Sequence, residues 1–474
     1  MQIPQQMLEQ YREAQQIIAS AEDIKVYSHI DCDGICSGAI LSTILDRQNN
    51  EHEIEFVNLD VLDDIELDHE LTIFSDLGSG QRVDGKAKKG QKIIILDHHP
   101  PLRDLDYGND KDYTYLEINP HHHGIDGSYY VCGGGLCYFL AREYGYDDLS
   151  WIGLLSAIGD MQNTRTGHFE GLNELIQQDA IDGGYLELSK NDINIYGRNT
   201  RPLFIALSYF SDVKLPITNN TNETMAVLEE LGIDEKHNRK TLNELTMAEK
   251  GKLYNYLSGS IAKVVPSEYV QYIPRLILGD SYTFLQEDPA SFLHDASEFS
   301  TAMNACGRNH EEKIAMEVLK GDRFVALDQL EVVSRDHRRN LAQSIEKVTE
   351  NGESSIIELE NLQYFDGTGI KPEIVGTITG MILGYCNWKK PIIGFTQTES
   401  DGLKVSLRCS RLLSYDGIHF GNIIRKVAGE VGGTGGGHSM ACGAYIPIEK
   451  KEEFLDDFMD KYEEPSIHRY NDNL

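Results

Sequence analysis

The chain has 474 residues, of which 40% are hydrophobic and 25% charged, a composition typical of a globular protein with two or three domains. It carries 76 Asp and Glu against 43 Lys and Arg, and the net charge of −33 argues against a protein-wide electrostatic attraction for nucleic acid. No apolar run reaches 18 residues, and the first 16 residues lack a secretory core. We therefore expect a cytoplasmic protein without a membrane span, whose eight scattered cysteines are reduced.

The first 160 residues alternate short apolar runs with segments of helical spacing. The predicted elements are a helix over residues 4–22, a strand over 24–28, a helix over 35–47, strands over 53–58, 71–75, 93–96 and 113–118, and helices over 135–144 and 149–158. This alternation predicts an α/β fold with a doubly wound, mostly parallel sheet, which binds its ligands at the carboxyl ends of the strands.

Acidic residues and histidines stand directly after several of these apolar segments. They are Asp31 and Asp33, Asp76, the triplet Asp97-His98-His99, and Asp160. Carboxylates gathered without a cation would repel one another, and a pair of divalent ions about 3.5–4 Å apart, as used in phosphoester hydrolysis, would relieve this. Carboxylate with imidazole suits manganese, iron or zinc better than calcium.

Each of these segments also has a simpler explanation. The loop at 31–34 is also typical of an Asp-rich helix N-cap, and the triplet at 97–99 is also compatible with an ordinary polar turn. For the three histidines at 121–123, a solvated or substrate-lining loop is favoured over a metal site, because neighbours in a loop point in different directions.

Taken in order, the motifs resemble a known family. His29-x-Asp31-x-Asp33-Gly34, Asp76, Asp97-His98-His99 and Gly159-Asp160 resemble the four motifs of the DHH phosphoesterase superfamily. The segment 433–443, which contains Gly-Gly-Gly-His, resembles the signature of the DHH-associated C-terminal domain. Segments 197–202 and 299–308 resemble archaeal RecJ-like single-strand exonucleases, the group that includes the GINS-associated nuclease.

The resemblance implies a set of site residues. The implied ligands of two divalent ions, manganese first and magnesium as the alternative, are His29, Asp31, Asp33, Asp76, His98 and Asp160. Asp76 is the implied bridge, whereas the role of His29 stays open because it stands two residues before Asp31 and many members have four. The resemblance also implies that His99 contacts the scissile phosphate, while Asp97 orients a histidine.

The last 125 residues predict a second, smaller α/β unit. Its predicted elements are strands over 355–359, 391–396 and 402–408 and a helix over 373–383. Strand alternation places Ser406 and Arg408 on one face, where a guanidinium can fork onto a phosphate. The glycine run is not a Walker loop, and either brings backbone N–H groups to an anion or forms a tight structural turn. The implied substrate-binding residues are Ser406, Arg408, Gly435, Gly436, Gly437 and His438.

The predicted division is a DHH domain over 1–202, a helical insertion or cap over 203–295, connecting helices over 296–348 and the DHH-associated domain over 349–474, with the active site in the cleft between lobes. Residues 401–450 carry six Lys and Arg against four Asp and Glu, so this segment is one place where a polyanion would bind if the chain holds one. The resemblance implies a manganese-dependent exonuclease on single-stranded DNA, 5′-to-3′, with RNA as a further substrate. It would release nucleoside monophosphates in replication or repair, with GINS or replicative-helicase components as partners. The alternatives are a short-oligonucleotide or small-substrate phosphoesterase and a catalytically weak helicase scaffold.

Overall fold

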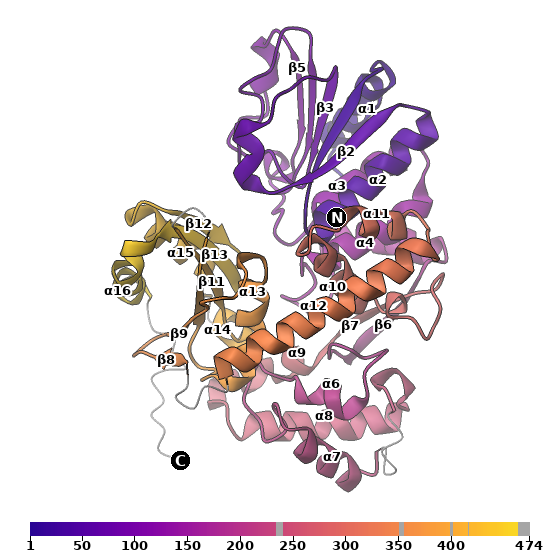
Figure 1. Cartoon of the computed structure of the whole chain (residues 1–474). Helices are drawn as coiled ribbons and strands as arrows, with labels where there is room; N and C mark the ends of the chain where they lie inside the picture. Colours follow the sequence, from indigo (N-terminus) through magenta and orange to yellow (C-terminus); the bar gives the residue numbers. More distant parts are fainter. Residues whose placement is uncertain (234–239, 350–354, 399–401, 416, 463–474) are drawn as a thin grey trace. The chain divides into compact units, whose positions relative to one another are not determined.

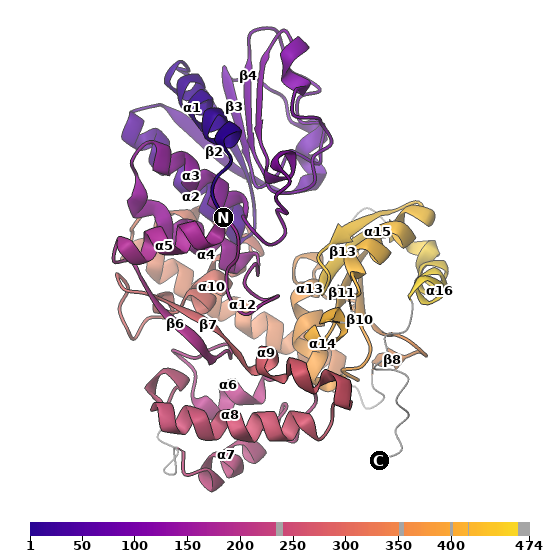
Figure 2. The ribbon, with the colours of Figure 1, turned by 180° about the vertical axis from the view of Figure 1, so that it is seen from behind.

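The computed structural model describes residues 1–233, 240–349, 355–398, 402–415 and 417–462. Contacts divide the chain into two compact units, Met1–Asp192 with Gly279–Asp336, and Ile193–Leu278 with His337–Leu474. Each unit is therefore assembled from two separate stretches of sequence (Figures 1 and 2). The four-segment division and the site between lobes stay predictions. In the described ranges, no helix is both long and apolar enough to cross a membrane.

A five-stranded parallel sheet organises the first unit. Its strands are β1 (Ile24–His29), β2 (His52–Val57), β3 (Leu71–Ser75), β4 (Lys92–Leu96) and β5 (Thr114–Ile118). The strand order is β2-β1-β3-β4-β5, and every pairing is parallel. The predicted α/β class and all five predicted strands are confirmed. The order reverses between β1 and β3, and at such a point an open α/β sheet leaves a crevice for ligands at the carboxyl ends of its strands.

Helices cover one face of this sheet. The α-helices of the unit are α1 (Gln5–Ala19), α2 (Cys32–Gln48), α3 (Gly133–Glu143), α4 (Ser150–Gly159), α5 (Asn173–Asp182), α10 (Ala296–Gly307), α11 (Glu312–Leu319) and the first part of α12 (Val325–Thr349). Val26, Ile73 and Ile94 belong to the core that the helices share. The alternate residues Tyr27 and Phe74 lie in a second core, formed with loops and the 3₁₀ turn η1 (Leu59–Asp64).

The second stretch of this unit completes the packing around α2. Helices α10 and α11 pack against α2, and α10 also packs against α4, although more than 100 residues separate them in the sequence. A two-stranded sheet of β6 (Leu186–Ile193) and β7 (Leu278–Phe284) joins the ends of the two stretches. These two strands were not predicted, because β6 is mostly polar and shows no regular alternation of buried and exposed residues.

A six-stranded mixed sheet organises the second unit. Its strands are β8 (Ile356–Glu358), β9 (Gln363–Asp366), β10 (Ile392–Gln397), β11 (Gly402–Arg408), β12 (Thr434–Gly437) and β13 (Ala441–Pro447), in the order β12-β13-β11-β10-β9-β8. Its helices are α13 (Pro372–Met381), α14 (Arg411–Tyr415), α15 (Phe420–Glu430) and α16 (Lys451–Lys461). The second α/β unit is confirmed, although β9, β12 and β13 were not predicted. The glycine run forms the edge strand β12, so the alternative of a tight turn was wrong.

The helical segment before this domain packs onto it within the same unit. Its helices are α6 (Leu203–Ser208), α7 (Thr221–Glu230), α8 (Met247–Ala262) and α9 (Ile273–Ile277), and they share one apolar core with the six-stranded sheet. Arg411 fixes this contact, since its guanidinium lies 2.5 Å from Asp212 Oδ2 and donates to the carbonyl of Leu276 at 2.7 Å.

Candidate metal centre

The turn after β1 places two aspartates at the start of α2. Asp31 is the N-cap, and its side chain accepts a hydrogen bond from the Gly34 N–H at 3.1 Å. Gly34 is required there, because a Cβ would lie 2.1 Å from the carbonyl oxygen of His29. The N-cap explanation of this loop is therefore correct. The cap uses one oxygen of the Asp31 carboxylate, and the second oxygen lies 3.0 Å from His29 Nδ1.

Asp76 stands at the end of β3 in a left-handed conformation. Its φ is 59°, which is uncommon for a residue with a side chain and is concentrated at functional sites. The side chain is 2% exposed, with Oδ1 3.3 Å from His98 Nε2 and Oδ2 3.5 Å from His29 Nδ1. Asp76 thus contacts the imidazoles of His29 and His98.

His98 lies at the centre of the carboxylates. Its Nδ1 is 2.8 Å from the carbonyl oxygen of Gly127 and donates to it, which leaves Nε2 to face the acids. Nε2 lies 3.5 Å from Asp33 Oδ2 and 3.9 Å from Asp160 Oδ2. This backbone contact therefore selects the tautomer that a metal ligand needs.

All six residues implied as metal ligands lie together in the first unit. Their ligand atoms form two sets within 4.8 Å, His29-Asp31-Asp76 and Asp33-His98-Asp160, and a third set joins Asp76 and His98 to Asp97 and His99. Asp76 and His98 each belong to two sets. His29 Nδ1 and Asp76 Oδ1 are buried without an aligned hydrogen bond. This donor set of carboxylates and imidazoles fits divalent manganese or magnesium.

The charges of the site explain its need for a cation. The pKa of Asp76 is raised to about 7 by burial and by the charges of Asp33 and Asp31. Burial lowers the pKa of His29, but the adjacent Asp31 and Asp76 raise it well above the ordinary value. Protons thus hold the metal-free cluster together, at positions where a divalent ion can replace them.

Asp97 orients His99. The Asp97 carboxylate is 1% exposed, and its Oδ1 accepts from the His99 backbone N–H at 3.1 Å and from Nδ1 at 2.8 Å. Burial lowers the pKa of His99, but Asp97 raises it above the ordinary value. The His99 side chain remains 48% exposed. This geometry fits a proton donor that is held by one nitrogen and presents the other.

Two residues near the site were not assigned a role from the sequence. Asn119 is fully buried and donates to the His99 carbonyl at 2.8 Å and to Ser79 Oγ at 2.9 Å. Arg308 follows α10; burial lowers its pKa, while Asp31 acts to raise it. Asn119 directly follows a predicted strand, as the aspartates do, and that position was the available signal.

The three histidines at 121–123 form the 3₁₀ turn η3 (Pro120–His123). His123 Nε2 lies 3.0 Å from Gln10 Oε1, and His122 Nε2 lies 3.9 Å from Glu117 Oε1. Among the described residues, none of the three histidines falls in a group of three metal-ligating side chains. The preference for a solvated or substrate-lining loop stays a prediction.

The residues implied to bind substrate lie in the second unit. A Cβ at Gly376 on α13 would lie 2.9 Å from Arg408 Nη2 and 3.4 Å from Ser406 Oγ, so both side chains face α13 as strand alternation predicted. Gly435, Gly436 and Gly437 pair with β13, and the His438 N–H donates to the Ala441 carbonyl at 2.9 Å. The sheet therefore places Arg408 and the glycine strand on two strands separated by β13.

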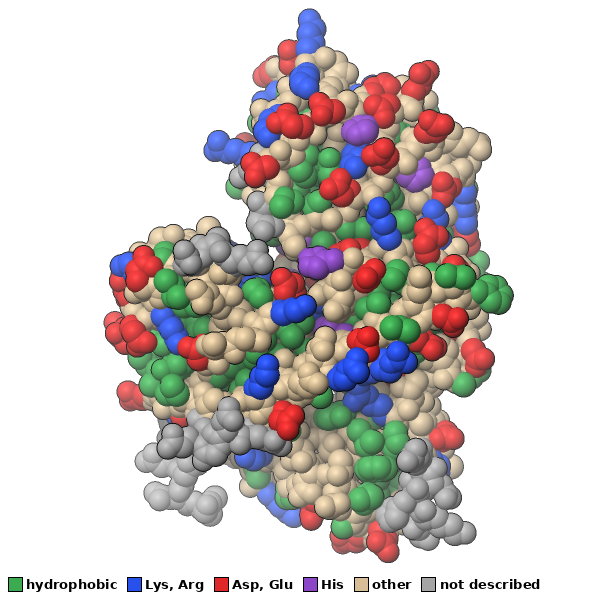
Figure 3. Space-filling view, in the orientation of Figure 1, with side chains coloured by type: hydrophobic (Ala, Val, Ile, Leu, Met, Phe, Trp, Pro, Cys, Tyr) green, Lys and Arg blue, Asp and Glu red, His purple; other side chains and the backbone are tan. Residues whose placement is uncertain are grey.

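The basic excess over 401–450 is partly used inside the unit. Arg411 binds Asp212, and Lys450 pairs with Glu453. Lys404 lies over the Tyr445 ring, 4.6 Å from its centroid. Figure 3 shows acidic and basic side chains interspersed over the visible face of the protein.

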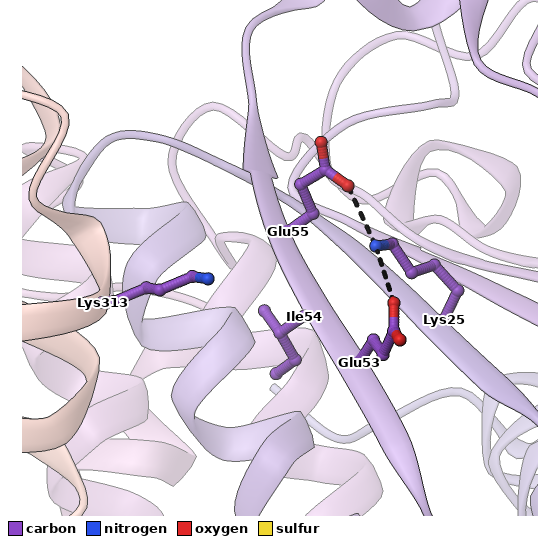
Figure 4. A pocket seen from close by; sticks show the side chains of 5 residues that line it. All are labelled: Lys25, Glu53, Ile54, Glu55 and Lys313. Atoms are coloured by element: carbon purple, nitrogen blue, oxygen red, sulfur yellow. Dashed lines mark hydrogen bonds and ion pairs between the residues drawn. The ribbon is translucent and has the colours of Figure 1, made fainter.

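A second acidic cluster lies beside the edge strand β2. Lys25 reaches between Glu53 and Glu55, and Ile54 and Lys313 complete the lining of this pocket (Figure 4). The ion-pair distances are 3.3 Å to Glu53 and 2.9 Å to Glu55. This cluster therefore contains its own cation.

Three domain families match the chain in succession. The DHH family N-terminal domain matches residues 23–158, the DHH-CID domain 195–273 and the DHHA1 domain 359–464. The protein MJ0831 of Methanocaldococcus jannaschii is 30% identical over 465 residues, which is 95% of this chain and 97% of that protein.

Solved structures share the fold at low identity. CDC45 from Entamoeba histolytica is similar with a TM-score of 0.60 and 14% identity, covering 96% of this chain and 98% of that one. RecJ from Thermus thermophilus, solved in complex with Mn²⁺, has a TM-score of 0.56 and 13% identity, covering 98% of this chain and 56% of that one. The chain therefore belongs to the DHH family, with DHH, DHH-CID and DHHA1 domains, and its fold resembles that of RecJ and CDC45.

Proposed function

We propose that this protein is a divalent-metal-dependent phosphodiesterase that digests single-stranded nucleic acid from an end. The observation that carries the proposal is the pair of ligand sets, His29-Asp31-Asp76 and Asp33-His98-Asp160, which Asp76 links through its contact with His98. Two divalent ions bound there would supply an activated water and neutralise the phosphate oxygens. Manganese is the preferred ion, and magnesium is the alternative. The similarity to a RecJ solved with Mn²⁺ supports this choice of ion.

The surrounding residues then have defined roles. His99, held by Asp97, donates a proton to the leaving oxygen through its free nitrogen. Arg308 supplies a buried positive charge beside Asp31 that can meet a substrate phosphate. Both residues would act on a negatively charged ester, which is why a phosphodiester is the proposed substrate.

Substrate binding is proposed for the DHHA1 domain. Arg408 and Ser406 on β11, with Gly435, Gly436, Gly437 and His438 along the edge strand, offer guanidinium, hydroxyl and backbone N–H groups to a phosphate. The outer N–H groups of an edge strand are not used by a neighbouring strand, and glycines have no side chain that would block an approaching anion. A GINS or helicase partner stays a prediction.

A digestion experiment tests the proposed activity. Single strands of DNA and RNA labelled at either end are incubated with the protein and Mn²⁺, Mg²⁺ or EDTA. We expect labelled mononucleotide to appear at once from the 5′-labelled DNA, and 3′-labelled DNA to shorten progressively. Hydrolysis confined to dinucleotides or pyrophosphate would favour the small-substrate alternative. Absence of hydrolysis with either metal, together with strand binding, would favour a scaffold.

A second experiment tests the substrate-binding role of Arg408. Arg408→Ala should raise KM by about 10- to 100-fold, the scale of one charge-assisted phosphate contact. The number of bound Mn²⁺ ions and kcat should not change. Lys426→Ala, an exposed change on α15, serves as the matched control. If Arg408→Ala bound single-stranded nucleic acid as tightly as the parent does, β11 would not be part of the substrate-binding site.

A further inference from the structure

The carboxylate of Asp33 accepts more backbone N–H groups than that of Asp31, the other aspartate at the start of α2. Its Oδ2 accepts the Gly133 N–H at 2.8 Å, and its Oδ1 accepts the Gly134 N–H at 2.6 Å. Oδ1 also accepts the Ser156 hydroxyl, which comes from α4. By contrast, the carboxylate of Asp31 accepts one backbone N–H, that of Gly34.

The two backbone donors are the first N–H groups of α3. Cys132 is the N-cap residue of this helix, and its side chain makes no capping hydrogen bond. The first N–H groups of a helix have no partner within the helix and favour an anion. The carboxylate of Asp33, from a residue 100 positions earlier, therefore takes the place of the capping side chain.

The start of α3 fits beside the site because it carries no side chains. A Cβ at Gly133 would lie 2.7 Å from Asp76 Cβ, and a Cβ at Gly134 would lie 2.2 Å from Ser156 Oγ. Both distances are too short for real atoms, so alanine at either position would displace Asp76 or Ser156. Gly133 therefore lies against Asp76, and Gly134 lies against Ser156, which donates to Asp33.

We propose that Ser156, acting with the glycine start of α3, is the positioning residue that fixes Asp33 as a ligand through one oxygen. The inference rests on the proposed metal centre and extends it to a residue that makes no contact with metal or substrate. An ionised carboxylate has about four acceptor positions, and three are used by the two N–H groups and the hydroxyl. The remaining position lies on Oδ2, the oxygen that is 3.5 Å from His98 Nε2. Cys132 Sγ lies 3.3 Å from Ser156 Oγ and donates to it, which turns the hydroxyl hydrogen toward Asp33.

Removing the hydroxyl should loosen Asp33 without removing a ligand. In Ser156→Ala, Oδ1 loses one of its two donors and the carboxylate gains freedom to rotate. Loss of a residue that orients a metal ligand typically weakens metal binding by about 10- to 100-fold. We expect the lower end of this range, about 10-fold, because the two backbone donors remain.

The matched control lies on the same helix. Ser150 and Ser156 are both fully buried residues of α4, but the Ser150 hydroxyl has no hydrogen-bond partner among the residues that the structure describes. Calorimetric titration of the metal-free full chain with Mn²⁺ should give an approximately tenfold higher Kd for Ser156→Ala and a change below about twofold for Ser150→Ala. Thermal unfolding in EDTA should show both variants folded. A second variant, Gly134→Ala, should also weaken Mn²⁺ binding, and Ser156→Gly in that background should relieve the collision without restoring the parental Kd.

The outcomes separate this inference from the proposed function. An unchanged Kd for Ser156→Ala, or an equal loss in both serine variants, overturns the positioning role. Absence of any Mn²⁺ binding by the parent overturns the metal centre and the positioning role together. A tenfold loss of affinity in a protein that hydrolyses no nucleic acid supports the positioning role and overturns only the proposed exonuclease.

Discussion

Two acidic clusters lie on the same parallel sheet, and they differ in how their charges are balanced. At the edge strand β2, Glu53 and Glu55 lie on either side of Lys25 from the neighbouring strand β1 (Figure 4). At the carboxyl ends of β1 and β3, the ion-pair partners of Asp31 and Asp76 are imidazoles. In the first cluster, a lysine pairs with the glutamates. In the second, the aspartates pair with imidazoles, which can lose their protons.

Burial makes this difference consequential. The side chains of Glu53 and Glu55 are 69% and 54% exposed, so water stabilises their charges. Asp76 is 2% exposed, and its pKa rises to about 7 because burial and neighbouring aspartates oppose its charge. An acidic cluster therefore indicates a metal site when it is buried and its ion pairs are with imidazoles, which can lose their protons, and the number of acids alone does not decide.

The largest expected effect comes from Asp76, which belongs to one of the two proposed ligand sets and contacts His98 of the other. Asp76→Asn keeps the shape of the side chain but removes its charge, so the site loses a ligand common to both proposed ions. We expect kcat to fall by at least about 100- to 1,000-fold, the range seen when a group that stabilises the transition state is removed. The measurement is Mn²⁺-dependent digestion of labelled single-stranded DNA, with Glu55→Gln as the control acid. Activity of a folded Asp76→Asn protein near that of the parent would contradict the shared role.

The same substitution should stabilise the metal-free protein at high pH. Because the pKa of Asp76 is raised from 3.8 to about 7, the folded state binds more protons than the unfolded state between these values. The free energy of unfolding of the parent must then fall as pH rises through this interval. The Asp76→Asn variant does not lose this stability, because Asn does not titrate. In EDTA at pH 8, we expect Asp76→Asn to exceed the parent in unfolding free energy by up to about 4 kcal/mol, with a much smaller difference at pH 4.

Urea unfolding in EDTA at the two pH values measures this difference. Excess Mn²⁺ should reverse the order at pH 8, because the parent gains binding energy that the variant lacks. A variant that is less stable than the parent at pH 8 in EDTA would show that the cluster is not strained by its own charges.

Asp97 and His99 form an intermediate case, in which a buried acid is paired with an imidazole. The charge of Asp97 raises the pKa of His99, so Asp97→Asn should lower it. If His99 donates a proton, activity falls as pH rises above its pKa, and the alkaline limb of the kcat/KM profile should shift to lower pH. Profiles measured with saturating Mn²⁺ test this shift. An alkaline limb at the parental pH would remove His99 from the proton-transfer step.

The parallel sheet and its site were accessible from the sequence because both depend on local order. The strands β1, β3 and β4 are mostly apolar, and Asp31, Asp76 and His98 stand within two residues of their ends, so parallel pairing brings them to one edge. Ser156 and Arg308 could not be assigned, because their roles depend on helices α4 and α10 packing against a distant loop. The strand β12 was missed because four residues containing three glycines carry no apolar alternation.

The smallest expected effect concerns the cluster that contains its own lysine. Glu55 is half-exposed, and pairs of this kind contribute about 0–1 kcal/mol, because water screens the charges and the side chains lose freedom when they pair. Burial lowers the pKa of Lys25, but Glu55 and Glu53 raise it above the ordinary value, so the pair persists at neutral pH. A double-mutant cycle with Lys25→Met and Glu55→Gln, followed by urea unfolding, should give a coupling energy below about 1 kcal/mol. The Kd for Mn²⁺ and the rate of digestion should stay at parental values in all three variants. A change in Mn²⁺ affinity in Glu55→Gln would mean that this exposed cluster communicates with the metal centre, and the contrast between a neutralised and an unneutralised cluster would no longer explain which of them binds metal.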